Sequence, residues 1–166
     1  MNTFKKITTQ YSETEDRIML SGEVSSDESV TLWINQRLLI RLLPHFFSWL
    51  EKQDTSSIPK EISQNFAQQA AKAELTPDSP VTANEQSKEC LIVAVDVTPV
   101  NGALKLVFRS KDNHETHLVL PGIVLRQWLS ILYSLWHTAE WPTDIWPEWM
   151  QSTTSEEMGE LTEIFH

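Results

Sequence analysis

The sequence is poor in cysteine and in glycine, and it has no long hydrophobic run. Cys90 is the only cysteine among 166 residues, which excludes an intrachain disulfide and a cysteine-rich zinc site. The four glycines (Gly22, Gly102, Gly122 and Gly159) are too scattered for a P-loop or a dinucleotide fingerprint. Every apolar stretch is interrupted far short of the ~20 residues that cross a bilayer, and no signal-peptide pattern opens the chain. We therefore expect a cytoplasmic protein that does not enter a membrane.

Basic residues are also scarce, with 13 Lys and Arg against 23 Asp and Glu and a net charge of −10. Nonspecific nucleic-acid binding depends on neutralising phosphates with Lys and Arg, so this balance opposes it. The imbalance is concentrated after Gln127, where seven carboxylates and no Lys or Arg occur. What the chain does have is 40% hydrophobic residues, enough at this length to bury a core without disulfides or metals.

The first half of the chain combines strand alternation with a helix pattern. A period of two predicts strands over 4–11, 17–24 and 30–34. Asn35 stands where an N-cap belongs, and a helix is predicted over 36–52. Pro44 removes a hydrogen bond inside that helix, so we expect a kink or a break there.

A second helix is predicted over 57–75, with Ser57 as its cap, followed by a loop over 76–89. Its apolar residues form a narrow stripe at helical spacing. These residues are Ile62, Phe66, Ala70 and Ala73.

The second half repeats the plan of the first, with strands over 90–97, 104–109 and 114–120 and a helix over 123–138. The first of these strands is nearly continuously apolar, which is typical of a central strand covered on both faces. Asn101-Gly102 indicates a hairpin with a type I′ turn.

Displacing the chain by 86 residues aligns the two halves without a gap from Phe4 to Leu50, although only five of the 47 pairs are identical. We predict an α+β fold of two antiparallel three-stranded units, each followed by a long apolar helix, as a pseudo-repeat. The alternative is that two half-buried meanders look alike without being repeats. The predicted organisation is a single domain over 1–150, with halves 1–53 and 90–138, a helical insert at 57–75, a loop at 76–89 and an acidic tail over 151–166.

The predicted core takes the inward-facing positions of these strands and helices. It consists of Ile18, Leu20, Leu32, Ile34, Leu42, Phe46, Leu91, Val93, Val95, Leu104, Leu106, Phe108, Leu118, Leu120, Leu125, Leu129 and Leu132.

No catalytic, cofactor or metal residue is predicted. The run HETHL, which begins at His114, resembles the zincin pattern HExxH but is one residue short. His114 and His117 stand three apart on a predicted strand, which directs them to opposite faces, so exposed strand histidines are expected. Cys90 opens a buried-looking strand, where a thiol is usually inert.

The helix over 123–138 is apolar around most of its circumference, more than one sheet can cover. Trp128, Leu132 and Trp136 belong to this surface, and aromatic residues at the centre of a patch commonly anchor interfaces. We therefore expect a two-fold homodimer. The competing account is internal, with the following segment folding back over the helix.

That following segment contains Trp141, Trp146 and Trp149, which are too costly to leave in water and so should dock on a surface. Beyond them, the acidic tail could bind a basic groove on another protein or pack on its own domain.

Arg37, Arg41 and His45 share one face of the helix over 36–52, at positions i, i+4 and i+8. The structural interpretation is the solvated side of an amphipathic helix. The functional interpretation is a stripe that binds a small anion or a partner protein.

The order of elements over 4–138 is strands, a pair of helices, three strands with a hairpin, and an apolar helix. It resembles the head domain shared by the end-joining scaffold proteins and their centriolar relatives. The resemblance implies a non-catalytic head that dimerises through the helix after the last strand. The helix over 123–138 departs from the family pattern, because it is short and lacks a sustained heptad stalk.

Taken together, the sequence predicts a non-enzymatic protein-interaction or adaptor module that needs no cofactor. A small-molecule binder or enzyme with a pocket between the two halves is the first alternative. A nucleic-acid-associated scaffold is the second, and the net charge opposes it.

Overall fold

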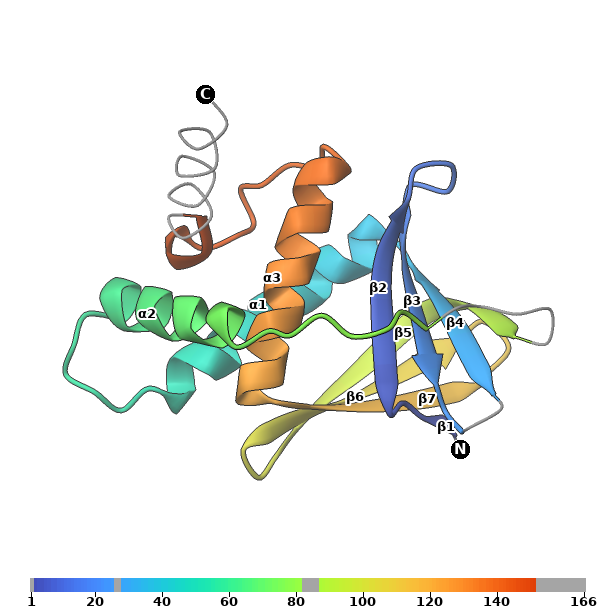
Figure 1. Ribbon diagram of the computed structural model, residues 1–166, viewed down its shortest axis with the longest axis horizontal. Helices are drawn as coiled ribbons and strands as arrows, with labels where there is room; N and C mark the ends of the chain where they lie inside the picture. Colours follow the sequence, from blue (N-terminus) through green and yellow to red (C-terminus); the bar gives the residue numbers. More distant parts are fainter. Residues whose placement is uncertain (1, 26–27, 82–86, 152–166) are drawn as a thin grey trace.

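The computed structural model describes residues 2–25, 28–81 and 87–151. Seven strands form one curled sheet, and three helices pack together beside it (Figure 1). In chain order the elements are β1 (Asn2–Thr3), β2 (Lys6–Ser12), β3 (Arg17–Glu23), β4 (Ser29–Ile34), α1 (Gln36–Gln53), α2 (Lys60–Ala73), β5 (Lys88–Val100), β6 (Ala103–Ser110), β7 (Glu115–Pro121) and α3 (Gly122–Thr138). The fold is α+β, as predicted.

The strand order in the sheet is β1-β7-β6-β5-β4-β3-β2. Each set of three, β2-β3-β4 and β5-β6-β7, is antiparallel, and the two sets join through a parallel β4–β5 pair. Parallel strands need a long connection, and α1 and α2 supply it.

The sheet curls because its first strand connects its two edges. β1 pairs with β7, and the next few residues carry the chain across to β3. The amide of Phe4 donates to the carbonyl of His117 at 2.9 Å, and the amide of Lys5 donates to the carbonyl of Glu23 at 2.9 Å. Gly22 is required at this crossing, since a Cβ there would lie 2.2 Å from the Phe4 ring.

Most of the predicted core is buried between the sheet and the helices. The exceptions lie on β5, where Leu91 and Val95 are only half-buried and Val93 is 55% exposed. The prediction for Val93 was wrong because the register shifts between Ile92 and Ala94, so Val93 is the extra residue of a bulge.

α1 follows its prediction at both ends. The side chain of Asn35 accepts a hydrogen bond from the amide of Leu38 at 2.9 Å, which confirms the N-cap. Pro44 does not break the helix. The carbonyl that loses its partner belongs to Ile40, a residue 41% exposed, so water can reach that side of the helix.

α2 forms where a helix was predicted, but its cap and its buried face are not the residues that the sequence singled out. Its cap is Pro59, with no side-chain hydrogen bond, instead of Ser57. Its buried residues are Gln64, Gln68 and Ala71, whereas the predicted stripe of Ile62, Phe66, Ala70 and Ala73 is exposed. The reason is that α2 packs against polar groups of α3, which satisfy the amide side chains of its glutamines.

The hairpin at Asn101-Gly102 is confirmed, with Val100 opposite Ala103. Of the two turn residues, only Gly102 has a positive φ, of 73°, so the turn is not the type I′ turn that was predicted. The predicted tail over 151–166 lies, apart from Gln151, outside the described residues.

Candidate functional site

β5 is the central strand of the seven-stranded order, as predicted, but it is not covered on both faces, since Val93 is 55% exposed. It pairs with β4 only over 88–91, because β4 then ends and the chain turns into α1. Beyond the bulge at Val93, the described residues of β5 pair on one side only, with β6. Every second residue of an antiparallel pair directs its N–H and C=O away from its partner. The backbone over 94–98 therefore presents an open strand edge, which ends at Pro99.

α1 runs beside this open edge with its basic residues exposed. Arg37, Arg41 and His45 all lie on the solvent side of the helix, and no ion pair or side-chain hydrogen bond joins them to other described residues. α1 carries no carboxylate before Glu51. In a chain of net charge −10, this face of α1 is a local positive region.

Between α1 and β5 lies a groove of about 460 Å³. We call it the α1–β5 groove, and its lining consists of Leu38, Arg41, Leu42, His45 and residues 93–97. Asp96, the carboxylate among them, is already held by the guanidinium of Arg109 at 2.7 and 2.8 Å. The groove thus combines an apolar floor, an open strand edge and a cationic wall.

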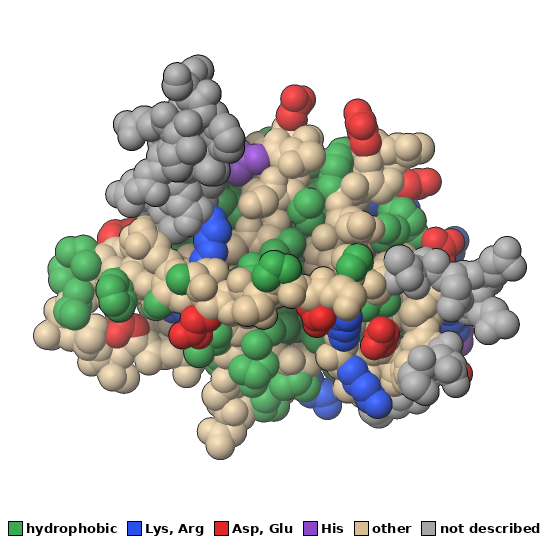
Figure 2. Space-filling model, viewed as in Figure 1, with side chains coloured by type: hydrophobic (Ala, Val, Ile, Leu, Met, Phe, Trp, Pro, Cys, Tyr) green, Lys and Arg blue, Asp and Glu red, His purple; other side chains and the backbone are tan. Residues whose placement is uncertain are grey.

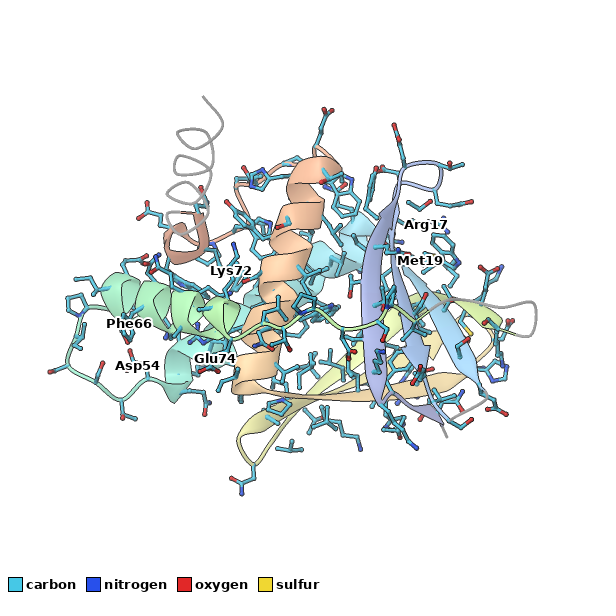
Figure 3. The ribbon with its side chains drawn as sticks, viewed as in Figure 1. Arg17, Met19, Asp54, Phe66, Lys72 and Glu74 are labelled. Atoms are coloured by element: carbon cyan, nitrogen blue, oxygen red, sulfur yellow. The ribbon has the colours of Figure 1, made fainter. Side chains whose placement is uncertain are left out.

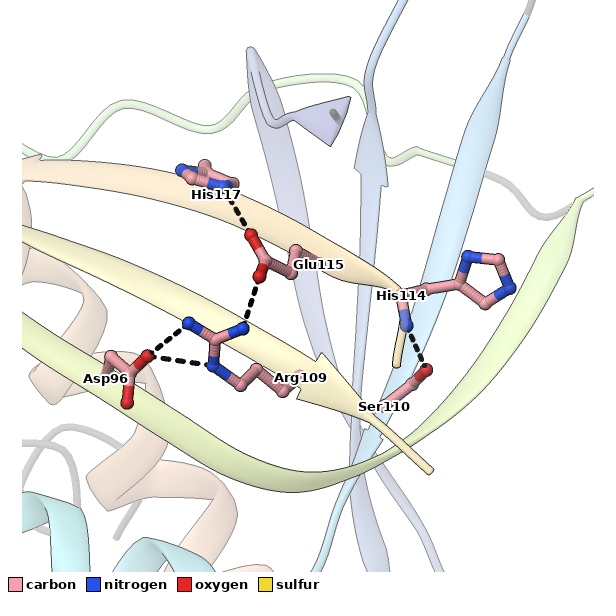
Figure 4. Close-up of polar contacts among 6 residues, drawn as sticks. All are labelled: Asp96, Arg109, Ser110, His114, Glu115 and His117. Atoms are coloured by element: carbon pink, nitrogen blue, oxygen red, sulfur yellow. Dashed lines mark hydrogen bonds and ion pairs between the residues drawn. The ribbon is translucent and has the colours of Figure 1, made fainter. Parts of the chain in front are cut away.

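The outer face of the sheet carries a row of paired charges (Figure 4). Arg109 contacts both Asp96 and Glu115, and Glu115 also lies 3.5 Å from the Nε2 of His117. The guanidinium of Arg109 holds the pKa of Glu115 below its usual range, and the two carboxylates raise the pKa of Arg109. These groups are paired with one another, so we assign the row a structural role.

The expectation of exposed strand histidines was half right. His114 is exposed and precedes β7, whereas His117 on β7 is 6% exposed. The reason is that His117 lies between Glu115 and the chain crossing at Phe4. Among the described residues, no group of three His, Cys, Asp or Glu is placed to hold a metal ion. Cys90 is buried, and burial raises the pKa of its thiol.

The tryptophans and the leucine expected at an interface lie inside their own chain. All are at most 6% exposed: Trp128, Leu132, Trp136, Trp141, Trp146 and Trp149. Trp146 packs against Trp136, with ring centroids 5.6 Å apart, and the indole N–H of Trp136 donates to the carbonyl of Pro142 at 2.7 Å. The segment 141–150 folds back over α3, which is the internal alternative to the dimer. The part of the apolar surface of α3 that carries Trp136 is thereby covered within one chain, whereas Ile123 and Val124 at the start of the helix are 55% and 42% exposed.

The sequence did not identify the open edge of β5, although two residues signalled it. Asp96 interrupts the apolar run, and Pro99 follows shortly after it. A charge and a proline in one strand are typical of edge strands, which use them to limit unwanted pairing.

Comparison of the chain with protein-family models, with curated proteins and with solved structures gives no match. None of the helices in the described part of the chain has the length and apolar character needed to cross a membrane.

Proposed function

We propose that this protein is a non-enzymatic interaction module that binds an extended acidic segment of a partner protein in the α1–β5 groove. The observation that carries the proposal is the juxtaposition of the open edge over 94–98 with Arg41, which lines the groove. Arg37 lies one turn before Arg41 on the same exposed helix face, and neither arginine has an acidic partner among the described residues. Adding a strand to an open edge is a recurring mode of peptide recognition, in which the backbone gives affinity and side chains give specificity.

Charge complementarity decides what kind of segment fits. A strand laid along β5 would direct alternate side chains toward α1, where carboxylates would meet the two guanidiniums. Arginine suits this role because its planar group can bind a carboxylate through two hydrogen bonds. The apolar residues between the carboxylates would contact Leu38 and Leu42 in the floor of the groove.

The test uses a capped peptide of alternating Glu and Val, about five repeats long, titrated into the full chain by calorimetry. We expect binding that weakens as salt rises, since ion pairs at the surface are screened. The double substitution Arg37→Glu and Arg41→Glu should weaken it by at least about tenfold. Arg17→Glu, a substitution at a half-buried arginine on β3 outside the groove, is the matched control and should change little.

A second control separates strand pairing from simple charge attraction. The same peptide with alternate backbone nitrogens methylated keeps every carboxylate but loses half of its N–H donors. It should bind at least about tenfold more weakly, because one register of backbone hydrogen bonds is blocked. Equal binding of the methylated and unmethylated peptides, or of the double variant and the wild type, would refute the proposal.

The finer features predicted from the sequence remain proposals. The element order β2-β3-β4-α1 and β5-β6-β7-α3 supports a relationship between the two halves and the likeness to end-joining scaffold heads. A homodimer would have to use a surface other than the covered face of α3. Light scattering tests it, since a dimer would have about twice the mass of 19.1 kDa.

A further inference from the structure

A second hollow lies on the opposite side of the fold, where the two edges of the sheet diverge. From the crossing at Phe4, β2 and β7 run apart, and α3 continues from β7 back toward β2 (Figure 1). The chain after α2 crosses this triangle as a strap over 75–80. The enclosed space, which we call the β2–β7 wedge, has a volume of about 630 Å³. Pockets for small molecules typically have volumes of about 300–1,000 Å³.

The walls of the wedge are mostly apolar. They include Leu75 from the strap, Val119 from β7, and Val124, Trp128 and Ile131 from α3. Leu75, Val119 and Val124 are 39%, 47% and 42% exposed, so the chain itself leaves this surface partly uncovered. In Figure 2, hydrophobic side chains follow the strap and continue below it.

The polar groups of the walls are largely engaged within the chain. The hydroxyl of Thr9 accepts the indole N–H of Trp128 at 3.0 Å, and the hydroxyl of Thr8 accepts the amide of Val81 at 2.8 Å. The side-chain amide of Gln127 donates to the carbonyl of Ala71 at 3.0 Å.

Two lysines stand beside this apolar space. Lys6 lies 3.4 Å from Asp78 on the strap, whereas Lys5 is exposed and has no ion pair with any described residue. The wedge therefore offers an apolar cavity with one unpaired positive charge at its rim.

We propose that the β2–β7 wedge binds a long-chain carboxylate, an anion with a single unbranched hydrocarbon tail. The tail lies between α3 and the strap, where it removes apolar surface from water, and the carboxylate pairs with Lys5. The proposal is independent of peptide binding at the α1–β5 groove.

The test is calorimetric titration of the full chain with sodium dodecanoate, kept below its micellar concentration. Lys5→Glu should weaken dodecanoate binding by roughly fivefold or more, because it replaces an ion pair with repulsion. It should leave dodecanol binding unchanged, since the alcohol has the tail without the charge. Val124→Glu should abolish the binding of both, because it places a carboxylate in the apolar wall.

Lys105→Glu, on β6 and outside the wedge, is the matched control for charge. Lys5 and Val124 are both exposed, so equal thermal midpoints should verify that each variant folds. Absence of dodecanoate binding to the wild type, or unchanged binding to Val124→Glu, would overturn the site. Equal loss of dodecanoate affinity in Lys5→Glu and Lys105→Glu would overturn the pairing of the carboxylate with Lys5.

Discussion

Two segments cover the sides of α3 that the sheet leaves open, and they do so with opposite chemistry. The segment 141–150 contributes buried tryptophans, which pack ring to ring with α3 and with α1. α2 contributes glutamines. The side chain of Gln68 donates to the carbonyl of Arg126 and to the hydroxyl of Ser130, each at 2.8 Å, while Gln64 accepts from the guanidinium of Arg126 at 2.7 Å.

The difference shows how stability and orientation can come from different contacts. Burial of aromatic surface supplies most of the free energy that holds the segment 141–150 in place. The hydrogen bonds of α2 contribute less net free energy, yet each buried group needs its own partner. Arg126 illustrates this demand: burial lowers the pKa of its guanidinium, and the charge of Asp54 opposes that shift.

The largest effect is expected from removing an aromatic contact of the segment 141–150. Trp146 is 2% exposed and packs against Phe47, Tyr133 and Trp136. Trp146→Ala should lower the free energy of unfolding by about 3–5 kcal/mol, because it leaves a cavity that the neighbours fill only partly. Urea denaturation followed by circular dichroism measures the loss.

Trp146→Phe is the matched control. The indole N–H of Trp146 has no hydrogen-bond partner among the described residues, so the phenyl ring retains most of the packing and loses no bond. Its effect should be clearly smaller than that of the alanine variant. Equal effects of the two substitutions would show that packing is not what this position supplies.

A smaller effect is expected from the polar contacts of α2. Gln68→Ala removes the donor that serves the Arg126 carbonyl and the Ser130 hydroxyl, leaving buried groups without a partner. The expected loss is about 1–3 kcal/mol in the free energy of unfolding. Gln69→Ala, one position along the same helix, removes a bond to Asn65 that is only partly buried and should cost less. The reverse order of the two variants would contradict the polar account of α2.

The comparison also explains which parts of the fold could be predicted. Alternation placed β3, β4, β6 and β7, and the amphipathic pattern placed α1, since period and burial agree in these elements. The sequence showed that α3 has more apolar surface than one sheet can bury, but it did not show that α2 and the segment 141–150 pack against that surface. A pattern reports that a face needs burial and not which segment provides it. The buried face of α2 was not predicted, because the contacts of Gln68 and Gln64 with Arg126 join residues 58 and 62 positions apart in the sequence.

For the candidate site, the sequence identified Arg37 and Arg41 but could not decide between a solvated helix face and a binding surface. Their spacing shows a common helix face, which is equally expected of solvated residues. What distinguishes them is the open edge of β5 beside that face, and this depends on where β4 ends. The tryptophans were predicted at an interface and lie in the core instead. Their residue type could not decide between the two, because aromatic residues are typical of both interfaces and cores.

A weaker contact holds the start of the segment 141–150, and acid should release it. The carboxylate of Asp16 accepts from the hydroxyl of Tyr11 at 2.6 Å and from the indole N–H of Trp141 at 2.9 Å. These bonds lower the pKa of Asp16 below its usual value. The stability they give is therefore complete above the unfolded pKa of about 4 and is lost as pH falls through the lower, folded pKa.

Asp16→Asn tests this contact, and asparagine also tolerates the positive φ of 52° at this position. The difference in urea midpoint between wild type and variant should be present near neutral pH and vanish in strong acid. The hydrogen bond to Asp16 raises the pKa of Tyr11 to about 12, so the phenol of the variant should titrate closer to 10. A Tyr11 titration identical in both proteins would show that the contact does not form in solution.

The smallest effect is expected from substitutions on the solvent-exposed side of α2. Phe66 is 75% exposed and Ile62 is 62% exposed, and Figure 3 shows Phe66 on the side of α2 that faces away from α3. Phe66→Gln should change the free energy of unfolding by no more than about 0.5 kcal/mol, because the side chain has little burial to lose and glutamine suits a helix. Gln64→Ala, on the opposite side of the same helix, is the contrasting variant. It removes bonds to the Leu50 carbonyl and to Arg126, and it should be the more destabilising substitution although it replaces the more polar residue. If Phe66→Gln lowers the free energy of unfolding as much as Gln64→Ala does, the apolar side of α2 is buried in solution. The contacts of α2 would then be apolar as well as polar, and α2 would no longer differ in chemistry from the segment 141–150.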